Sequence, residues 1–126
     1  MKKRKILVIE DDRAISGLLV HILEGRDYKV EPAYNGLAGL EKTKSFEPDL
    51  ILLDVNMPLM DGWQLLKALK SSAKTYEIPI VMCTEHSLMK EVEEALANGA
   101  SGYIMKPFTT ERVIGKIMDL LGPDEQ

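Results

Sequence analysis

The amino-acid sequence predicts an α/β domain, a doubly wound five-stranded parallel sheet with five helices. Short β-rich runs alternate with segments of helical spacing along the chain. Several runs are apolar at consecutive positions, as expected for strands that are covered on both faces of a parallel sheet. The length of 126 residues fits a single domain that buries about two-thirds of its unfolded surface on folding.

The five predicted strands are short runs rich in β-branched and other apolar residues. They cover residues 5–9, 28–33, 50–53, 78–83 and 102–105. Parallel strands that follow one another in this way are joined by right-handed crossovers. The segments between the runs are therefore expected to be helices that pack on the sheet.

The predicted helices follow from apolar residues spaced three and four apart, which form one stripe on a helix. The stripes are Ile15, Leu18, Leu19, Ile22 and Leu23; Leu65, Leu66 and Leu69; Leu88, Val92 and Leu96; and Val113, Ile117, Leu120 and Leu121. The second helix, around residues 37–44, has the weakest pattern because it carries Gly36 and Gly39.

Capping residues agree with these helices. The predicted N-caps, whose side chains accept hydrogen bonds from the first helical turn, are Asp12, Ser87 and Thr109. The predicted left-handed residues that follow helices are Gly25, Gly99 and Gly122.

Composition and charge exclude several classes of protein. The single cysteine, Cys83, excludes an internal disulfide and suits a reducing compartment. No apolar run approaches the ~18 residues of a membrane helix, and a net charge of -4 argues against a dedicated nucleic-acid binder. We expect one cytoplasmic domain over residues 1–126, with a core from about 4 to 122, that contacts neither membrane nor nucleic acid directly.

Polar residues follow four of the predicted strands. Glu10 and Asp11 follow the first strand, Asp54 the third, Thr84 the fourth and Lys106 the fifth. Ligands of doubly wound sheets bind beyond the carboxyl ends of the strands. If the first and third strands are neighbours, the three acids converge at one end of the sheet.

Such a cluster favours a bound cation. Two like charges about 4 Å apart repel by about 4 kcal/mol at an effective dielectric constant of about 20. Mg²⁺ would relieve this repulsion with carboxylate, carbonyl and water ligands, and Lys106 adds a positive charge. A carboxylate can itself be the nucleophile and form an aspartyl phosphate. Each residue alone is also common as a cap or surface residue, so it is their joint placement that predicts a phosphoryl-transfer site.

The chain resembles the receiver domain of bacterial two-component response regulators, most closely the single-domain CheY-like type. The resemblance covers roughly residues 5–121. The matching motifs are Glu10-Asp11-Asp12, the segment 52–58 around Asp54 with Asp61-Gly62, Thr84, and the segment 99–108 around Lys106-Pro107. The resemblance implies the flavodoxin/CheY-like strand order 2-1-3-4-5.

The resemblance assigns roles to the acids. Asp54 would accept a phosphoryl group from a sensor histidine kinase or a histidine phosphotransfer protein. The carboxylates of Asp11 and Asp54 and the backbone carbonyl of Asn56 would ligate Mg²⁺, while Glu10 would act through water.

It also assigns roles to the later strand ends. Thr84 and Lys106 would contact the phosphoryl oxygens, and Tyr103 would be the aromatic switch residue. The peptide bond before Pro107 is expected to be cis. With no output domain in the chain, the signal would leave through helix 4, strand 5 and helix 5 to a downstream protein, from a monomer or a weak phosphorylation-dependent dimer.

Two positions depart from the family pattern. Glu85 follows the switch threonine, where the family usually has a small residue, and His86 with Asn56 lies where side chains influence the hydrolytic water. Because Glu85 adds bulk and negative charge beside an anionic group, we expect a comparatively persistent phosphorylated state. If Glu85 points into solvent, it has no such effect, and a protonated His86 would attract the phosphoryl group or orient water.

Other functions remain to be weighed against the switch. The chain can also be a phosphorelay intermediate or the receiver fragment of a larger regulator. An aspartate-nucleophile phosphatase of the haloacid-dehalogenase type needs a second Asp where this chain has Asn56. A flavin carrier needs hydroxyls, glycines and N–H groups where the first loop is acidic. A receiver fold that serves only as a phosphate-independent scaffold is disfavoured, because every residue of the phosphoryl-transfer site is present. We therefore expect self-phosphorylation and autodephosphorylation only, and no other enzymatic activity.

Overall fold

One parallel sheet organises the chain, whose computed structural model describes residues 2–85 and 89–122. Its strands are β1 (Lys5–Ile9), β2 (Lys29–Ala33), β3 (Leu50–Asp54), β4 (Ile80–Thr84) and β5 (Gly102–Met105). They lie in the order β2-β1-β3-β4-β5, and neighbouring strands are parallel. The predicted fold class and strand order are confirmed.

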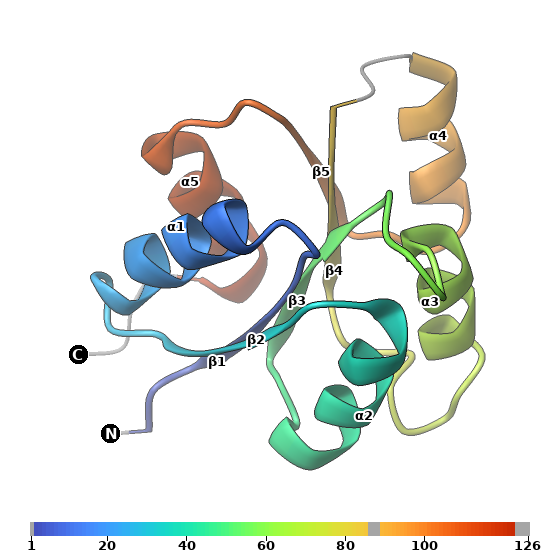
Figure 1. Ribbon diagram of the computed structural model, residues 1–126, viewed down its shortest axis with the longest axis horizontal. Coiled ribbons are helices and arrows are strands. Elements are labelled where there is room, and N and C mark those ends of the chain that lie inside the picture. The colour runs from blue at the N-terminus through green and yellow to red at the C-terminus, as the bar shows by residue number, and fades with distance from the viewer. Residues whose placement is uncertain (1, 86–88, 123–126) are drawn as a thin grey trace.

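Helices cover both faces of this sheet. They are α1 (Arg13–Glu24), α2 (Gly36–Phe46), α3 (Gly62–Lys70), α4 (Met89–Ala97) and α5 (Thr110–Leu121). Figure 1 shows α1 and α5 on one face and α2, α3 and α4 on the other. None of the helices in the described ranges is long and apolar enough to cross a membrane.

Two neighbouring interior strands, β1 and β3, explain the consecutive apolar runs. The side chains packed in the core with α1 and α5 include Ile6, Val8, Leu50 and Leu52. Those packed with α2, α3 and α4 include Leu7, Ile9, Ile51 and Leu53. Alternate residues of a strand point to opposite faces, so a strand with two covered faces must be apolar throughout. Each such buried side chain stabilises the fold by about 2 kcal/mol.

Strand boundaries differ from the predicted ones in a way that concerns the site. β3 and β4 each extend one residue further than predicted, so Asp54 and Thr84 are the last residues of their strands. β4 begins at Ile80 rather than at residue 78, because Pro79 has no N–H group to donate within a sheet. The backbone of both residues is therefore part of the sheet and does not belong to a loop.

Gly25 caps α1 as predicted, but the left-handed conformation predicted for it is wrong. Gly25 has a right-handed conformation (φ -66°) and extends the last turn of α1. The left-handed residue is Asp27 (φ 66°), and the chain reversal is closed by a 3.2 Å hydrogen bond from the N–H of Tyr28 to the carbonyl of Leu23. Aspartate tolerates this conformation better than most residues, so the reversal occurs two residues later than predicted.

Four of the other predicted caps have the backbone angles or hydrogen bonds expected of them. Gly99 and Gly122 have positive φ, of 101° and 83°. Asp12 accepts hydrogen bonds from the N–H groups of Ala14 and Ile15, and Thr109 caps α5. These four predictions are confirmed, whereas Ser87 lies outside the described residues.

Among the predicted stripe residues in the described ranges, two are exposed, and Leu88 lies outside those ranges. Leu18 of α1 is 51% exposed and Leu96 of α4 is 50% exposed. The buried residues of α1 are Ser16, Leu19 and Leu23, which form a face narrower than the apolar stripe. The stripe therefore located the helix correctly but overestimated the width of its buried face.

Candidate functional site

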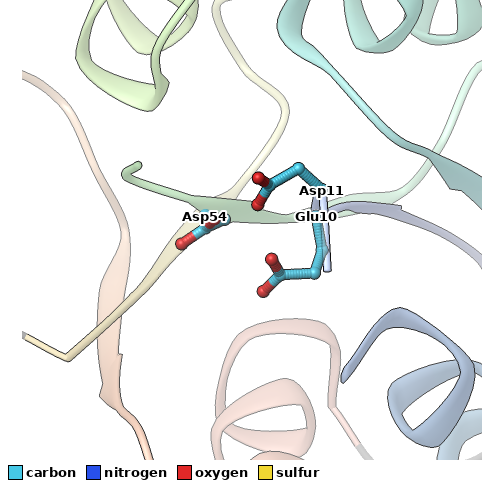
Figure 2. A group of neighbouring side chains, drawn as sticks. All are labelled: Glu10, Asp11 and Asp54. Carbon is cyan, nitrogen blue, oxygen red and sulfur yellow. The ribbon is translucent and has the colours of Figure 1, made fainter. Parts of the chain in front are cut away.

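Three carboxylates meet where β1 and β3 end. Ile9 of β1 pairs with Leu53 of β3, which places Glu10 beside Asp54. Ligand oxygens of Glu10, Asp11 and Asp54 lie within 4.8 Å of one another, and Figure 2 shows the three side chains converging from the two strands. Glu10 is 2% and Asp54 5% exposed, whereas Asp11 lies at the surface. The structure thus brings together the acids that the sequence placed at separate strand ends.

Lys106 reaches this cluster from the end of β5. Its Nζ donates to Glu10 Oε1 at 2.6 Å and to Asp54 Oδ1 at 3.1 Å. The backbone N–H of Lys106 donates to the carbonyl of Thr84 at 2.8 Å, which ties this segment to β4. The peptide bond to Pro107 is cis. Glu10, expected to act through water, contacts the lysine directly and also accepts a hydrogen bond from the N–H of Asp12 at 3.1 Å.

The electrostatics of the site follow from its burial. Burial and then the charge of Glu10 raise the pKa of Asp54 from its ordinary value to about 7, against the opposing effect of Lys106. Burial alone would lower the pKa of Lys106, but the hydrogen bond that Lys106 donates to Glu10 and the charge of Asp54 outweigh it, so the lysine stays protonated with a raised pKa. One ammonium group does not balance three carboxylates.

The donor set fits Mg²⁺. The crowded ligand atoms are all carboxylate oxygens, which hard divalent cations prefer. Burial and then the charge of Glu10 raise the pKa of Asp54, so its ionised form is disfavoured here, and a bound cation would favour it. Asp11 and Asp54 would hold the ion, with Glu10 close by. Asn56, the third expected ligand, lies exposed on the loop that follows β3.

Thr84 and Tyr103 lie on the strands beyond Asp54. Asp54 pairs with Cys83 in the sheet, so Thr84 is one residue further along the neighbouring strand and is fully buried. Tyr103 on β5 is half-buried. Burial raises the pKa of Tyr103, and a side-chain hydrogen bond with Thr84 opposes this. The two residues expected to form the switch are therefore in direct contact.

Glu85 lines a cavity beside the site. This cavity, of about 530 Å³, is bounded by Ile15, Leu18, Glu85, Lys106, Pro107 and Phe108. Glu85 is exposed and shares this cavity with Lys106 and with Ile15 and Leu18 of α1. His86 lies outside the described residues. The apolar lining was not predicted from the sequence, although Leu18, an exposed residue of the predicted stripe, belongs to it.

Comparisons with known proteins agree with this geometry. The family model described as the response regulator receiver domain matches residues 6–118. The DNA-binding dual master transcriptional regulator RpaA of Synechocystis is 34% identical over 93% of this chain and 48% of its own length. The response regulator MprA of Mycobacterium ulcerans is 36% identical over 93% of this chain and 50% of its own length.

A solved structure gives the same result. The chemotaxis response regulator CheY4 of Vibrio cholerae superposes with a TM-score of 0.89 and 31% identity, over 94% of this chain and 99% of that one. The chain spans about half the length of the two regulators named above. On the match over residues 6–118, the chain belongs to the family of response regulator receiver domains.

Proposed function

We propose that this chain is the phosphorylation-activated switch of a two-component system, with Asp54 as the phosphoacceptor. The observation that carries the proposal is the position of Asp54, which is buried at a strand end. Glu10 and Asp11 lie close to it, and Lys106 donates a hydrogen bond to its Oδ1. A histidine kinase or a histidine phosphotransfer protein would supply the phosphoryl group, so a role as phosphorelay intermediate uses the same site.

The chemistry follows from the positions of the side chains. A carboxylate oxygen of Asp54 attacks the phosphorus of the donor, a new O–P bond forms, and the bond to the donor atom breaks with its electron pair leaving on the donor. Lys106, already 3.1 Å from Asp54 Oδ1, is placed to neutralise a phosphoryl oxygen, and Thr84 to donate to another. Bound Mg²⁺ would neutralise the negative charge shared by the carboxylates and the phosphoryl group.

The signal is proposed to leave through α4, β5 and α5. If the Thr84 hydroxyl turns toward a phosphoryl group, it must leave Tyr103, with which it is hydrogen-bonded here. That exchange would alter the packing of Tyr103 on β5. Each of the three elements carries an exposed large apolar side chain, Leu96, Met105 and Met118 respectively, which a downstream protein would cover.

We propose that the chemistry is directed at the chain itself rather than at an outside substrate. Two residues after Asp54, where an aspartate phosphatase needs its second acid, the chain has Asn56. The side-chain amide of Asn56 is far too weak an acid to protonate a leaving group. The free buried thiol of Cys83 suits the cytoplasm, where a kinase would present its phosphohistidine.

Mass spectrometry of the intact protein tests the phosphoacceptor. Incubation with acetyl phosphate and Mg²⁺ should add about 80 Da, the mass of HPO₃, to the unaltered chain. Asp54→Asn should gain nothing, since an amide oxygen is a poor nucleophile. The adduct should also be absent when EDTA replaces Mg²⁺. An equal adduct on Asp54→Asn would show that another residue is the acceptor.

A further inference from the structure

The loop between β3 and α3 displays an apolar side chain in a strained conformation. Leu59 is 78% exposed, the most exposed of the large apolar side chains in the described ranges, and its φ is 71°. A lone exposed leucine is ordinary, but a bulky residue at positive φ is a rare outlier. The other non-glycine residues with positive φ in the described ranges, Asp27 and Glu47, are both acidic and polar.

The backbone around Leu59 is fixed on both sides. The N–H of Met60 donates to the carbonyl of Pro58 at 2.8 Å, so Leu59 is the middle residue of a three-residue turn. A Cβ atom at Gly36 would lie 2.3 Å from the carbonyl oxygen of Met60, which shows how tightly α2 packs on the turn. The turn therefore cannot relax without moving α2.

The base of the loop is tied to the phosphoacceptor. The N–H of Gly62 donates to the carbonyl of Val55 at 2.8 Å. A Cβ at Gly62 would lie 2.3 Å from the carbonyl oxygen of Asp54. The loop that carries Leu59 is thus anchored at its base to the end of the strand that carries the reacting carboxylate.

Neither the exposure of the Leu59 side chain nor its positive φ stabilises the fold. A glycine or an asparagine would adopt this φ with less strain, and a polar side chain would be better solvated. Strained residues of this kind persist mostly at functional sites, where the surrounding structure holds them. The most direct use for a rigid apolar side chain at this place is contact with another molecule.

We infer that Leu59 is a specificity-determining anchor for the protein that donates the phosphoryl group. The inference rests on the proposed function. Asp54 is 5% exposed, so a protein donor must cover the surrounding edge to bring its phosphorus to the carboxylate. Leu59 lies five residues beyond Asp54 on that edge, and the apolar cavity lined by Ile15 and Leu18 gives a second contact beside Lys106. The donor would present an apolar depression to Leu59, next to its phosphohistidine.

The test compares a protein donor with a small one. The cytoplasmic fragments of the histidine kinases of the organism that carries this chain are autophosphorylated with ATP, and the fastest donor to the unaltered chain is selected. For Leu59→Gln, transfer from that kinase should fall about tenfold in kcat/KM, the equivalent of about 1.4 kcal/mol. Labelling by acetyl phosphate, which is too small to reach Leu59, should stay within about twofold of the unaltered rate.

Tyr76→Gln is the control for the loss of a large exposed side chain, because Tyr76 is 51% exposed and precedes β4, at the opposite end of that strand from Thr84. Its transfer rate from the kinase should equal that of the unaltered chain. Equal rates for Leu59→Gln and the control would overturn the inference, as would labelling by acetyl phosphate but by none of the kinases. If acetyl phosphate fails to label the unaltered chain, the proposed function itself fails, so the two failures are distinguishable.

Discussion

In the absence of Mg²⁺, Asp54→Asn is expected to be more stable than the unaltered chain at pH 8, by about 4 kcal/mol. Burial and the charge of Glu10 raise the pKa of Asp54 from 3.8 to about 7 in the folded protein. The folded state therefore holds this proton more tightly than the unfolded state. As the pH rises from about 4 to about 7, the unaltered chain loses stability because Asp54 must ionise in its buried site, and asparagine is free of this cost.

Urea unfolding in EDTA between pH 4.5 and 8 measures this difference. The advantage of Asp54→Asn should grow up to about pH 7 and then stay constant. Asp119→Asn, at an exposed position on α5, should match the unaltered chain throughout. Adding Mg²⁺ should stabilise the unaltered chain and Asp119→Asn by mass action, but neither Asp54→Asn nor Asp11→Ala. Equal stability of Asp54→Asn and the unaltered chain at pH 8 would contradict the electrostatic account.

Gly62→Ala should lower the free energy of unfolding by about 3 kcal/mol, which is at the upper end of the range for atoms added to a well-packed core. Gly62 is the first residue of α3, and a Cβ there would lie 2.3 Å from the carbonyl oxygen of Asp54 and 2.8 Å from Cα of Val55. Both are backbone atoms of β3 or the residue after it, so no flexible side chain can move aside. Because the displaced peptide belongs to Asp54, labelling by acetyl phosphate should slow as well.

Gly17→Ala is the matched control for this substitution. Gly17 lies within α1, and apart from its chain neighbours and the backbone of its own helix no atom would lie within 4 Å of an added Cβ. Alanine is the better helix former, so Gly17→Ala should raise the free energy of unfolding by about 1 kcal/mol. Denaturant unfolding of the two variants should therefore give changes of opposite sign. A Gly62→Ala variant as stable as the unaltered chain would show that the helix start is free to shift.

The strand-end residues could be predicted from the sequence because parallel topology determines their position. Once β1 and β3 are recognised as buried parallel strands, their carboxyl ends must share an edge, and Glu10 and Asp54 lie there whatever the helices do. Lys106 lies at this edge for the same reason, because it follows the parallel strand β5. Its hydrogen bonds to both acids depend on side-chain packing across β4, which no local pattern encodes.

Features set by contacts between distant segments could not be predicted. Gly36 and Gly39 weakened the helical pattern of α2, yet added Cβ atoms there would collide with Met60 and Ile9, so these glycines allow the close packing of the helix. The positive φ of Leu59 has no signal in its residue type, which normally avoids that conformation. It follows from how α2 and α3 hold the loop between them.

Chemical shifts on addition of beryllofluoride and Mg²⁺ test the central claim most directly, because the complex mimics a phosphoryl group on Asp54. If chemistry at Asp54 is transmitted through Thr84 and Tyr103, the backbone amides of α4, β5 and α5 should shift together with those around the site. Asp54→Asn should show none of these changes. Shifts confined to the residues around Glu10, Asp54 and Lys106 would contradict the account, since the site would then be chemically competent but not a switch.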